Sequence, residues 1–292
     1  MTVGAEVASL ADTHGVGRIT DREFRRFQLL LEQEIGIYLA DAKRALLTAR
    51  LIKRMRALGI STFGAYLDLA DRDPGERQQM YDAICTNETS FFREPRHFHF
   101  LAQTLLPRWR AARAAGQRSG RIRVLSAGCS TGQELYSVAM LLADHCAGWE
   151  LELVGVDVST KVLAVARAGV FPAERLHEVP AHYRKAYLMR GVGELEGQIK
   201  VVPELRALTR FQQANLTHRG GLGGPYDLVF CHNVLIYFRA GTKAQVMARL
   251  IAELAPGGHL FLGHAESLLG AGAVEPVLPT VYVRAGERRA RR

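Results

Sequence analysis

The sequence predicts a doubly wound α/β domain that follows an all-helical N-terminal domain. Its 292 residues are 48% hydrophobic and 23% charged, as is typical of a globular protein. From residue 21 to about 84, apolar residues recur at helical spacing. After residue 120, short apolar strands alternate with helices, and this alternation indicates a mostly parallel sheet.

The helical part is predicted to span residues 20–85, after a flexible, small and polar tail at residues 1–19. The segment TDRE from Thr20 to Glu23 resembles a capping box, which predicts that a helix begins there. A second helix is expected from residue 41 to 58, where Gly59 ends it.

The second helix is strongly basic. Between Lys43 and Arg56 it carries six basic residues and no acidic one. At about 100° per residue, Lys43, Arg50 and Arg54 fall within roughly 40° of one another. An adjacent apolar stripe, which would pack, consists of Leu47, Leu51, Met55 and Leu58. The basic face is either a solvated surface or a docking surface for acidic groups, and the pattern alone leaves both open.

The sheet domain is predicted to span residues 86–285, followed by a basic tail at 286–292. Strands are expected at 121–125, 151–156, 226–231 and 259–263, and helices at 95–115, 133–144, 161–167 and 240–254. The interval before residue 226 is much longer than a normal crossover. Residues 171–213 are therefore predicted to form an inserted small β-subdomain with an antiparallel hairpin, including a strand at 199–202.

Composition narrows the possible functions. The four cysteines form no C-x-x-C pair, which favours a cytosolic chain with reduced thiols. Residues 1–17 lack the features of a signal peptide, and no apolar run is long enough to span a membrane. His97 and His99 are two apart on a helix and make poor metal ligands, so no metal is expected. The net charge of +9 favours acidic partners without choosing among nucleic acid, anionic membrane and acidic protein.

Small and acidic residues follow the first two predicted strands. The turn SAGCSTGQE at 126–134 holds Gly128 and Gly132, so it lacks the G-x-G-x-x-G fingerprint. Asp157 ends the second strand, where an acid can accept hydrogen bonds from ribose hydroxyls or merely cap a helix. Together they favour a nucleoside ligand, and Glu134 could then take the ammonium of an attached amino acid. The alternative role of Glu134 is stabilisation of the helix dipole.

Two further segments are candidates for the site. FCHNVLIYF at 230–238 follows a strand expected near the middle of the sheet, and offers the Asn233 amide and the Tyr237 hydroxyl. Ile236 and Phe238 in this segment are expected to be core residues. TNETSFFRE at 86–94 lies between the two predicted domains, and domain junctions are preferred ligand sites.

These segments resemble the motifs of one family. TNETSFFR at 86–93 is similar to the TN-x-T-x-FFR motif of the CheR family of chemotaxis receptor methyltransferases, and SAGCSTGQE to its cofactor turn. FCHNVLIYF is similar to FCRNV-x-IYF, and GHAES at 263–267 to GHSE. Four motifs in the family's order identify the chain as a member. The resemblance implies a Rossmann-like methyltransferase domain and an S-adenosylmethionine-dependent protein-glutamate O-methyltransferase, with S-adenosylhomocysteine as product.

The resemblance also implies residue roles. Arg93 and Tyr237 match residues that face the transferred methyl and the incoming carboxylate, and are the expected catalytic residues. The expected cofactor-binding residues are Asn87, Thr89, Arg93, Gly128, Glu134, Asp157, Asn215, Leu216, His232 and Asn233. There are departures: His232 stands where the family usually has Arg, and Gln133 and Leu135 replace the usual Glu and Pro.

Two partner surfaces are implied as well. The basic helix, with Lys43, Arg50 and Arg54, resembles the family's substrate-docking helix, which binds the acidic, helical cytoplasmic domain of methyl-accepting receptors. The segment MRGVGELEG at 189–197 resembles the family's β-subdomain, which in some members captures a C-terminal receptor peptide by strand addition. Neither nucleic acid nor direct membrane insertion is expected.

The expected reaction needs no general base. A glutamate has a pKa of about 4.3, so the acceptor carboxylate is already ionised at neutral pH. The alternatives are an S-adenosylmethionine-binding sensor protein and a methyltransferase of another acceptor such as RNA. A nicotinamide oxidoreductase is disfavoured because the glycine fingerprint is missing.

Overall fold

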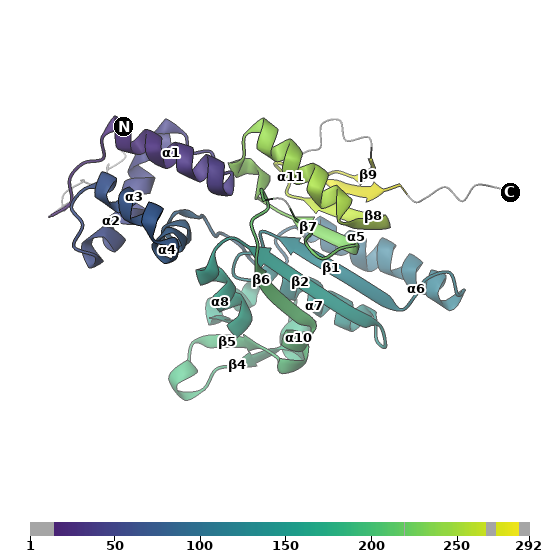
Figure 1. The fold of residues 1–292 in the computed structure, drawn as a ribbon. Helices are drawn as coiled ribbons and strands as arrows, with labels where there is room; N and C mark the ends of the chain where they lie inside the picture. Colours follow the sequence, from purple (N-terminus) through teal and green to yellow (C-terminus); the bar gives the residue numbers. More distant parts are fainter. Residues whose placement is uncertain (1–14, 219, 267–272, 286–292) are drawn as a thin grey trace, which may run out of the picture. The chain divides into compact units, whose positions relative to one another are not determined.

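The computed structural model describes residues 15–218, 220–266 and 273–285, in two compact units (Figure 1). One unit contains the described residues up to Glu34 and Tyr38–Cys85; the other contains Ile35–Ile37 and the chain from Thr86 onward. Most of the predicted N-terminal tail, Ser267 of the GHAES segment and the basic tail lie outside the described residues. No helix in the described ranges is long and apolar enough to cross a membrane.

The first unit is helical, as predicted. Its elements are α1 (Asp21–Ile35), a 3₁₀ turn (Asp41–Lys43), α2 (Arg44–Ala57), α3 (Phe63–Arg72) and α4 (Pro74–Ile84). Thr20 and Glu23 form the predicted capping box: the Thr20 hydroxyl accepts from the Glu23 N–H at 3.2 Å, and the Glu23 carboxylate accepts from the Thr20 N–H at 2.8 Å. Leu47, Leu51 and Met55 are buried, so the apolar stripe of α2 does pack.

The second unit is built on a seven-stranded sheet with the order β6-β2-β1-β7-β8-β10-β9. The strands are β1 (Arg121–Ala127), β2 (Glu150–Asp157), β6 (Thr209–Gln213), β7 (Tyr226–Cys231), β8 (Leu254–Leu262), β9 (Val274–Leu278) and β10 (Val281–Arg284). The first five pair in parallel, and β10 pairs antiparallel with both β8 and β9. The mostly parallel sheet and the central place of β7 confirm the prediction.

Helices cover both faces of this sheet (Figure 1). Along β1, Ile122 and Val124 join the core on one face, and Leu125 and Ala127 join the core on the other. The first face is covered by α5 (Pro95–Phe100), a π-helical turn (Leu101–Leu105), α6 (Leu106–Ala114), α7 (Gln133–His145) and α8 (Thr160–Ala168), the second by α11 (Ala240–Ala252). This is the doubly wound arrangement.

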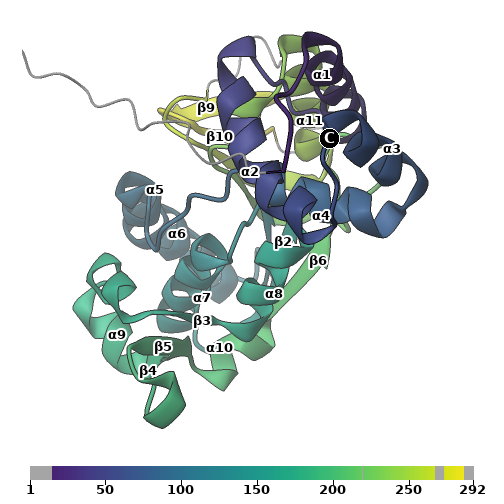
Figure 2. The same ribbon diagram turned by 90° about the vertical axis from the view of Figure 1, so that its left-hand side faces the viewer.

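A three-stranded antiparallel sheet lies in the predicted insertion (Figure 2). Its order is β3 (Val170–Pro172), β5 (Gln198–Val201), β4 (Leu188–Arg190), accompanied by short 3₁₀ turns (Ala173–Glu178 and Gly193–Leu195), α9 (Ala181–Tyr187) and α10 (Pro203–Leu208). One boundary needs correction: residues 209–213, placed in the insertion, form β6 of the main sheet. Only Phe211 of this strand is buried, and the sequence TRFQQ has no apolar strand pattern, so it did not predict a strand of the main sheet.

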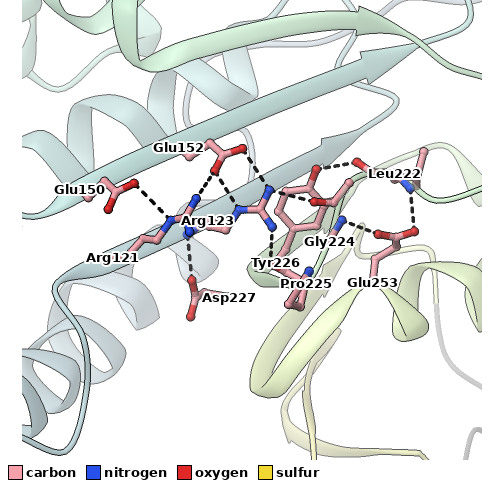
Figure 3. A network of polar contacts seen from close by, with 11 residues as sticks. Arg121, Arg123, Glu150, Glu152, Leu222, Gly224, Pro225, Tyr226, Asp227 and Glu253 are labelled. Carbon is pink, nitrogen blue, oxygen red and sulfur yellow. Dashed lines mark hydrogen bonds and ion pairs between the residues drawn. The ribbon is translucent and has the colours of Figure 1, made fainter.

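A network of ion pairs and hydrogen bonds lies at the amino-terminal ends of the strands of this sheet (Figure 3). The Arg123 guanidinium donates to both oxygens of Glu152, at 2.8 and 3.0 Å, and to the carbonyls of Gly223 and Pro225, both at 2.8 Å. The hydrogen bonds from Arg123 lower the pKa of Glu152 to about 2. This network ties β1 and β2 to the segment before β7.

We expect E152Q to lower the free energy of unfolding by about 1 kcal/mol at neutral pH, since the pair is partly exposed. Because the pKa of Glu152 is lower when folded, the ionised carboxylate stabilises the fold above its unfolded pKa of about 4.3. The difference between wild type and E152Q should therefore shrink as pH falls toward about 2. Urea unfolding at several pH values measures it. The control is E150Q, because Glu150 is 70% exposed and should show no difference.

Candidate active site

The carboxyl ends of β1, β2 and β7 bring three predicted segments together. Gly128, in the turn after β1, has a φ of +77°, and a Cβ there would lie 2.4 Å from Cγ2 of Val234. The turn therefore packs directly against the segment that follows β7, at a distance that only glycine allows. The predicted cofactor turn and the FCHNVLIYF segment thus share one site.

Asp157 lies at the end of β2 beside this turn. Its Oδ2 accepts a hydrogen bond from the Ser130 N–H at 2.9 Å, and its Oδ1 accepts one from the Ser159 N–H at 2.9 Å. The Ser159 side chain in turn caps α8. Asp157 thus organises both the turn after β1 and the start of α8.

Glu134 lies in the first turn of α7, with its side chain 14% exposed. Its Oε1 accepts from the Ser126 hydroxyl at 2.6 Å, and its Oε2 lies 2.6 Å from Nδ1 of His232. These two contacts fix the carboxylate in one orientation at the ends of β1 and β7.

His97 is a site residue that the sequence analysis missed. Its buried ring, from α5, places Nδ1 3.0 Å from Nε2 of His232. The two histidines are far apart in the sequence, and no spacing pattern connects them. The available signal was the departure from the family's usual arginine at position 232.

The TNETSFFR segment is held by contacts from several elements of the same unit. The Asn87 carbonyl accepts from the Ser130 hydroxyl at 2.9 Å, and the Thr89 carbonyl accepts from Arg175 at 3.3 Å. Phe92 has a φ of +50°, a conformation that costs free energy in a non-glycine residue and is common at functional sites. These contacts position the backbone of Asn87 and Thr89.

The two expected catalytic residues come from different segments. Arg93 is exposed, and its Nη1 donates to the Glu88 carbonyl at 2.8 Å. Tyr237 ends a 3₁₀ turn (Leu235–Tyr237) directly after β7 and is half-buried. Ile236, the middle residue of this 3₁₀ turn, is 46% exposed, so the expectation that it belongs to the core is wrong.

A buried carboxylate, Glu266, builds the backbone around Asn233. It is 1% exposed and accepts from the N–H groups of Asn233 at 2.9 Å, Leu235 at 2.7 Å and Gly263 at 2.9 Å. Asn233 itself has a φ of +59°. In the sequence, the only signal for this role of Glu266 is its place in the GHAES motif.

Asn215 and Leu216 follow β6, at the same edge of the parallel sheet. Oδ1 of Asn215 accepts from the Thr217 N–H at 2.9 Å, and the carbonyls of Asn215 and Leu216 both accept from Arg249 at 3.0 Å. These hydrogen bonds hold the segment in place at the carboxyl end of β6.

The basic face of α2 belongs to the helical unit. Arg54 donates to the buried Glu76, with Nε at 3.0 Å from Oε1, and Glu76 also accepts from the Tyr66 hydroxyl at 2.8 Å. Arg50 donates to the Ile84 carbonyl. Arg54 thus has a structural role in its own unit, and docking by Lys43, Arg50 and Arg54 stays a prediction.

The residues at the carboxyl ends of β6, β2, β1 and β7 fit an adenosyl cofactor that carries an amino acid. Glu134 and Asp157 supply two carboxylates for an ammonium and for ribose hydroxyls. Oδ1 of Asn233 is buried and has no hydrogen-bond partner among the described residues, so it can accept from a ligand. Nowhere in the described ranges do three or more His, Cys, Asp or Glu residues gather as metal ligands.

Comparison with known proteins agrees with this fit. Residues 87–283 match the family model described as "CheR methyltransferase, SAM binding domain", and residues 22–85 match "CheR methyltransferase, all-alpha domain". The chain is 39% identical to "Chemotaxis protein methyltransferase 2" of Pseudomonas aeruginosa, over 90% of this chain and 93% of that protein. It is also 39% identical to "Chemotaxis protein methyltransferase" of Escherichia coli, over 85% of each.

The doubly wound sheet, its cofactor edge and the matched domain define an S-adenosylmethionine-dependent methyltransferase. The all-helical domain before it narrows the class further. The chain belongs to the CheR methyltransferase family, which confirms the resemblance seen in its four motifs.

Proposed function

We propose that this protein methylates glutamate side chains of methyl-accepting chemotaxis receptors and so forms glutamyl methyl esters. The observation that carries this proposal is the match of both domains to one family, together with 39% identity to relatives named chemotaxis protein methyltransferases. The setting is the cytoplasm, where the four free cysteines would stay reduced.

The chemistry required of the protein is alignment. S-adenosylmethionine supplies a methyl group on a positively charged sulfur; the carboxylate oxygen bonds to that carbon as the carbon–sulfur bond breaks. The acceptor carboxylate is ionised at neutral pH, so no side chain needs to remove a proton. Opposite charges partly cancel in the transition state, and orientation and exclusion of water should supply most of the acceleration.

The cofactor is assigned to the edge formed by β6, β2, β1 and β7. Asp157 would accept from its ribose hydroxyls and Glu134 from its ammonium, because both carboxylates lie at the carboxyl ends of the parallel strands. Gly128 would allow close approach of the backbone. The remaining residues assigned to the cofactor site are Asn87, Thr89, Arg93, Asn215, Leu216, Asn233 and His232, the last of which would act through Glu134.

Arg93 would steer the acceptor carboxylate, and Tyr237 would orient it by a hydrogen bond. We expect R93A to lower kcat/KM for the receptor about 10- to 100-fold and Y237F to lower it about 10-fold. R93K, which keeps the charge but loses the planar fork, should retain more activity than R93A. Steady-state methyl transfer measures these values. Unchanged kcat/KM in both R93A and Y237F would remove these residues from the mechanism.

The partner is proposed to be the cytoplasmic helical domain of the receptor. Lys43, in the 3₁₀ turn before α2, and Arg50 on α2 offer positive charge to an acidic helical surface. Arg54 contributes less because Glu76 neutralises it. The steering should weaken with rising salt.

A C-terminal receptor peptide could add as a strand to the small sheet. β4 is an edge strand, followed by a hairpin in which Val192 is 81% exposed. A Cβ at Gly191 would lie 1.8 Å from the Leu195 carbonyl oxygen, so only glycine fits this tight hairpin. These features support tethering at β4.

The test is transfer of radiolabelled methyl from S-adenosylmethionine to purified receptor cytoplasmic fragments, with total RNA as the competing acceptor. We expect label on the receptor and none on RNA. Label on RNA alone would replace the proposed acceptor. Cofactor binding without label on any receptor would favour a sensor protein.

A further inference from the structure

A chain of four hydrogen-bonding groups runs behind the proposed ammonium site. Oε2 of Glu134 lies 2.6 Å from Nδ1 of His232, whose Nε2 lies 3.0 Å from Nδ1 of His97. Nε2 of His97 lies 3.0 Å from Oγ1 of Thr280. The His232 side chain is 5% exposed, and both its ring nitrogens are engaged in these contacts. His232 therefore acts on a ligand through Glu134.

The proton positions in this chain follow from the partners. An ionised carboxylate can only accept, so Nδ1 of His232 carries a proton. Burial, the largest single effect, opposes a charge on His232, but the charge and hydrogen bond of Glu134 together with the charges of Glu94 and Glu266 outweigh it and raise the pKa of His232. Burial, and then the charge on His232, lower the pKa of His97 to about 4. His232 is thus the imidazolium, and neutral His97 accepts from its Nε2.

Other charged groups face the same pair. Glu94, just before α5, and Glu266, after β8, both favour the charged form of His232. Glu94 also lies 3.1 Å from Nδ1 of His264. The ring of Phe230 lies edge-on, with its centroid 5.8 Å from that of His232. Acidic groups therefore surround an imidazolium that, unlike an arginine, can lose its proton near neutral pH.

We propose that His232 releases a proton when the cofactor binds, and that His97 is the positioning residue that receives it. This inference rests on the proposed placement of the cofactor's ammonium at Glu134. Two cations on one buried carboxylate repel each other, so the arriving ammonium expels the proton of the imidazolium. The proton moves from Nε2 of His232 to Nδ1 of His97, which gives its own Nε2 proton toward half-exposed Thr280 and solvent.

The consequence is a pH-dependent affinity. As pH rises through the pKa of His232, the ammonium no longer has to displace a proton, and binding strengthens. The rise ends at higher pH, where the ligand's own amino group loses its proton. An arginine at position 232 would abolish the first of these two effects.

The test is isothermal titration calorimetry of the full chain with S-adenosylhomocysteine at pH 6.5, in buffers of different ionisation enthalpy. At this pH the ligand's amino group is already charged, so a released proton comes from the protein. We expect wild type to release a measurable fraction of a proton. H232R and H232Q should bind with no release in this range.

His97 has its own pair of variants. H97N keeps an acceptor at the position of Nδ1 and should retain proton release, whereas H97F should shift it to lower pH, because an imidazolium without an acceptor is less stable. Binding by wild type with no buffer-dependent heat would overturn the inference, as would equal release from H232R. Complete absence of binding would instead contradict the proposed cofactor site itself.

Discussion

D157A should weaken S-adenosylmethionine binding by at least about 100-fold, because two hydrogen bonds to a charged acceptor would be lost. The carboxylate also holds the Ser130 and Ser159 N–H groups, so the turn loses its support as well. Equilibrium titration of the cofactor measures the change.

The matched controls separate the two roles of Asp157. D157N keeps one oxygen that can accept from a backbone N–H group. Compared with D157A, it should therefore restore stability more than cofactor affinity. D144A removes an acid that is 48% exposed on α7 and should leave affinity unchanged. A D157A variant that binds the cofactor as tightly as wild type would show that the ribose lies elsewhere.

E266Q should lower the free energy of unfolding by about 3 kcal/mol and kcat/KM by about 100-fold. Glu266 accepts three N–H groups with one buried carboxylate, and the amide of Gln can replace only part of that capacity. The backbone that presents Asn233 and Tyr237 would then relax. Urea unfolding and methyl-transfer kinetics, measured on the same preparation, check both effects.

Glu253 provides the control for this prediction. It accepts the Leu222 and Gly224 N–H groups, both at 2.7 Å, at the opposite edge of the sheet (Figure 3). E253Q should therefore lower stability while leaving kcat/KM of the folded protein unchanged. If E266Q and E253Q reduce kcat/KM equally, Glu266 has no specific link to the site.

The strands with buried apolar runs were predictable, and the exposed ones were not. β1, β2, β7 and the end of β8 have runs of buried residues that stand out in the sequence. β6 and β9 carry one buried residue each. They form strands because they pair with neighbouring strands that are distant in the sequence, and their own residues do not predict this pairing. Ile236 shows the converse, an apolar residue that a short helical turn leaves exposed.

The site was predictable where topology fixed it. Asp157 and Glu134 follow parallel strands, and the carboxyl ends of such strands meet at one edge. His97 and Glu266 reach the same edge from α5 and from beyond β8, and only the packed structure brings them to His232 and Asn233. Their roles are to hold other site groups in place, which no spacing in the sequence expresses.

The proposed product is a glutamyl methyl ester on a receptor. The most direct measurement is base treatment of receptor fragments labelled with radioactive methyl, followed by counting of volatile methanol. Nearly all protein-bound label should be released, because a methyl ester hydrolyses in alkali. Label that stays on the protein after base treatment would indicate transfer to nitrogen or sulfur and would contradict the claim.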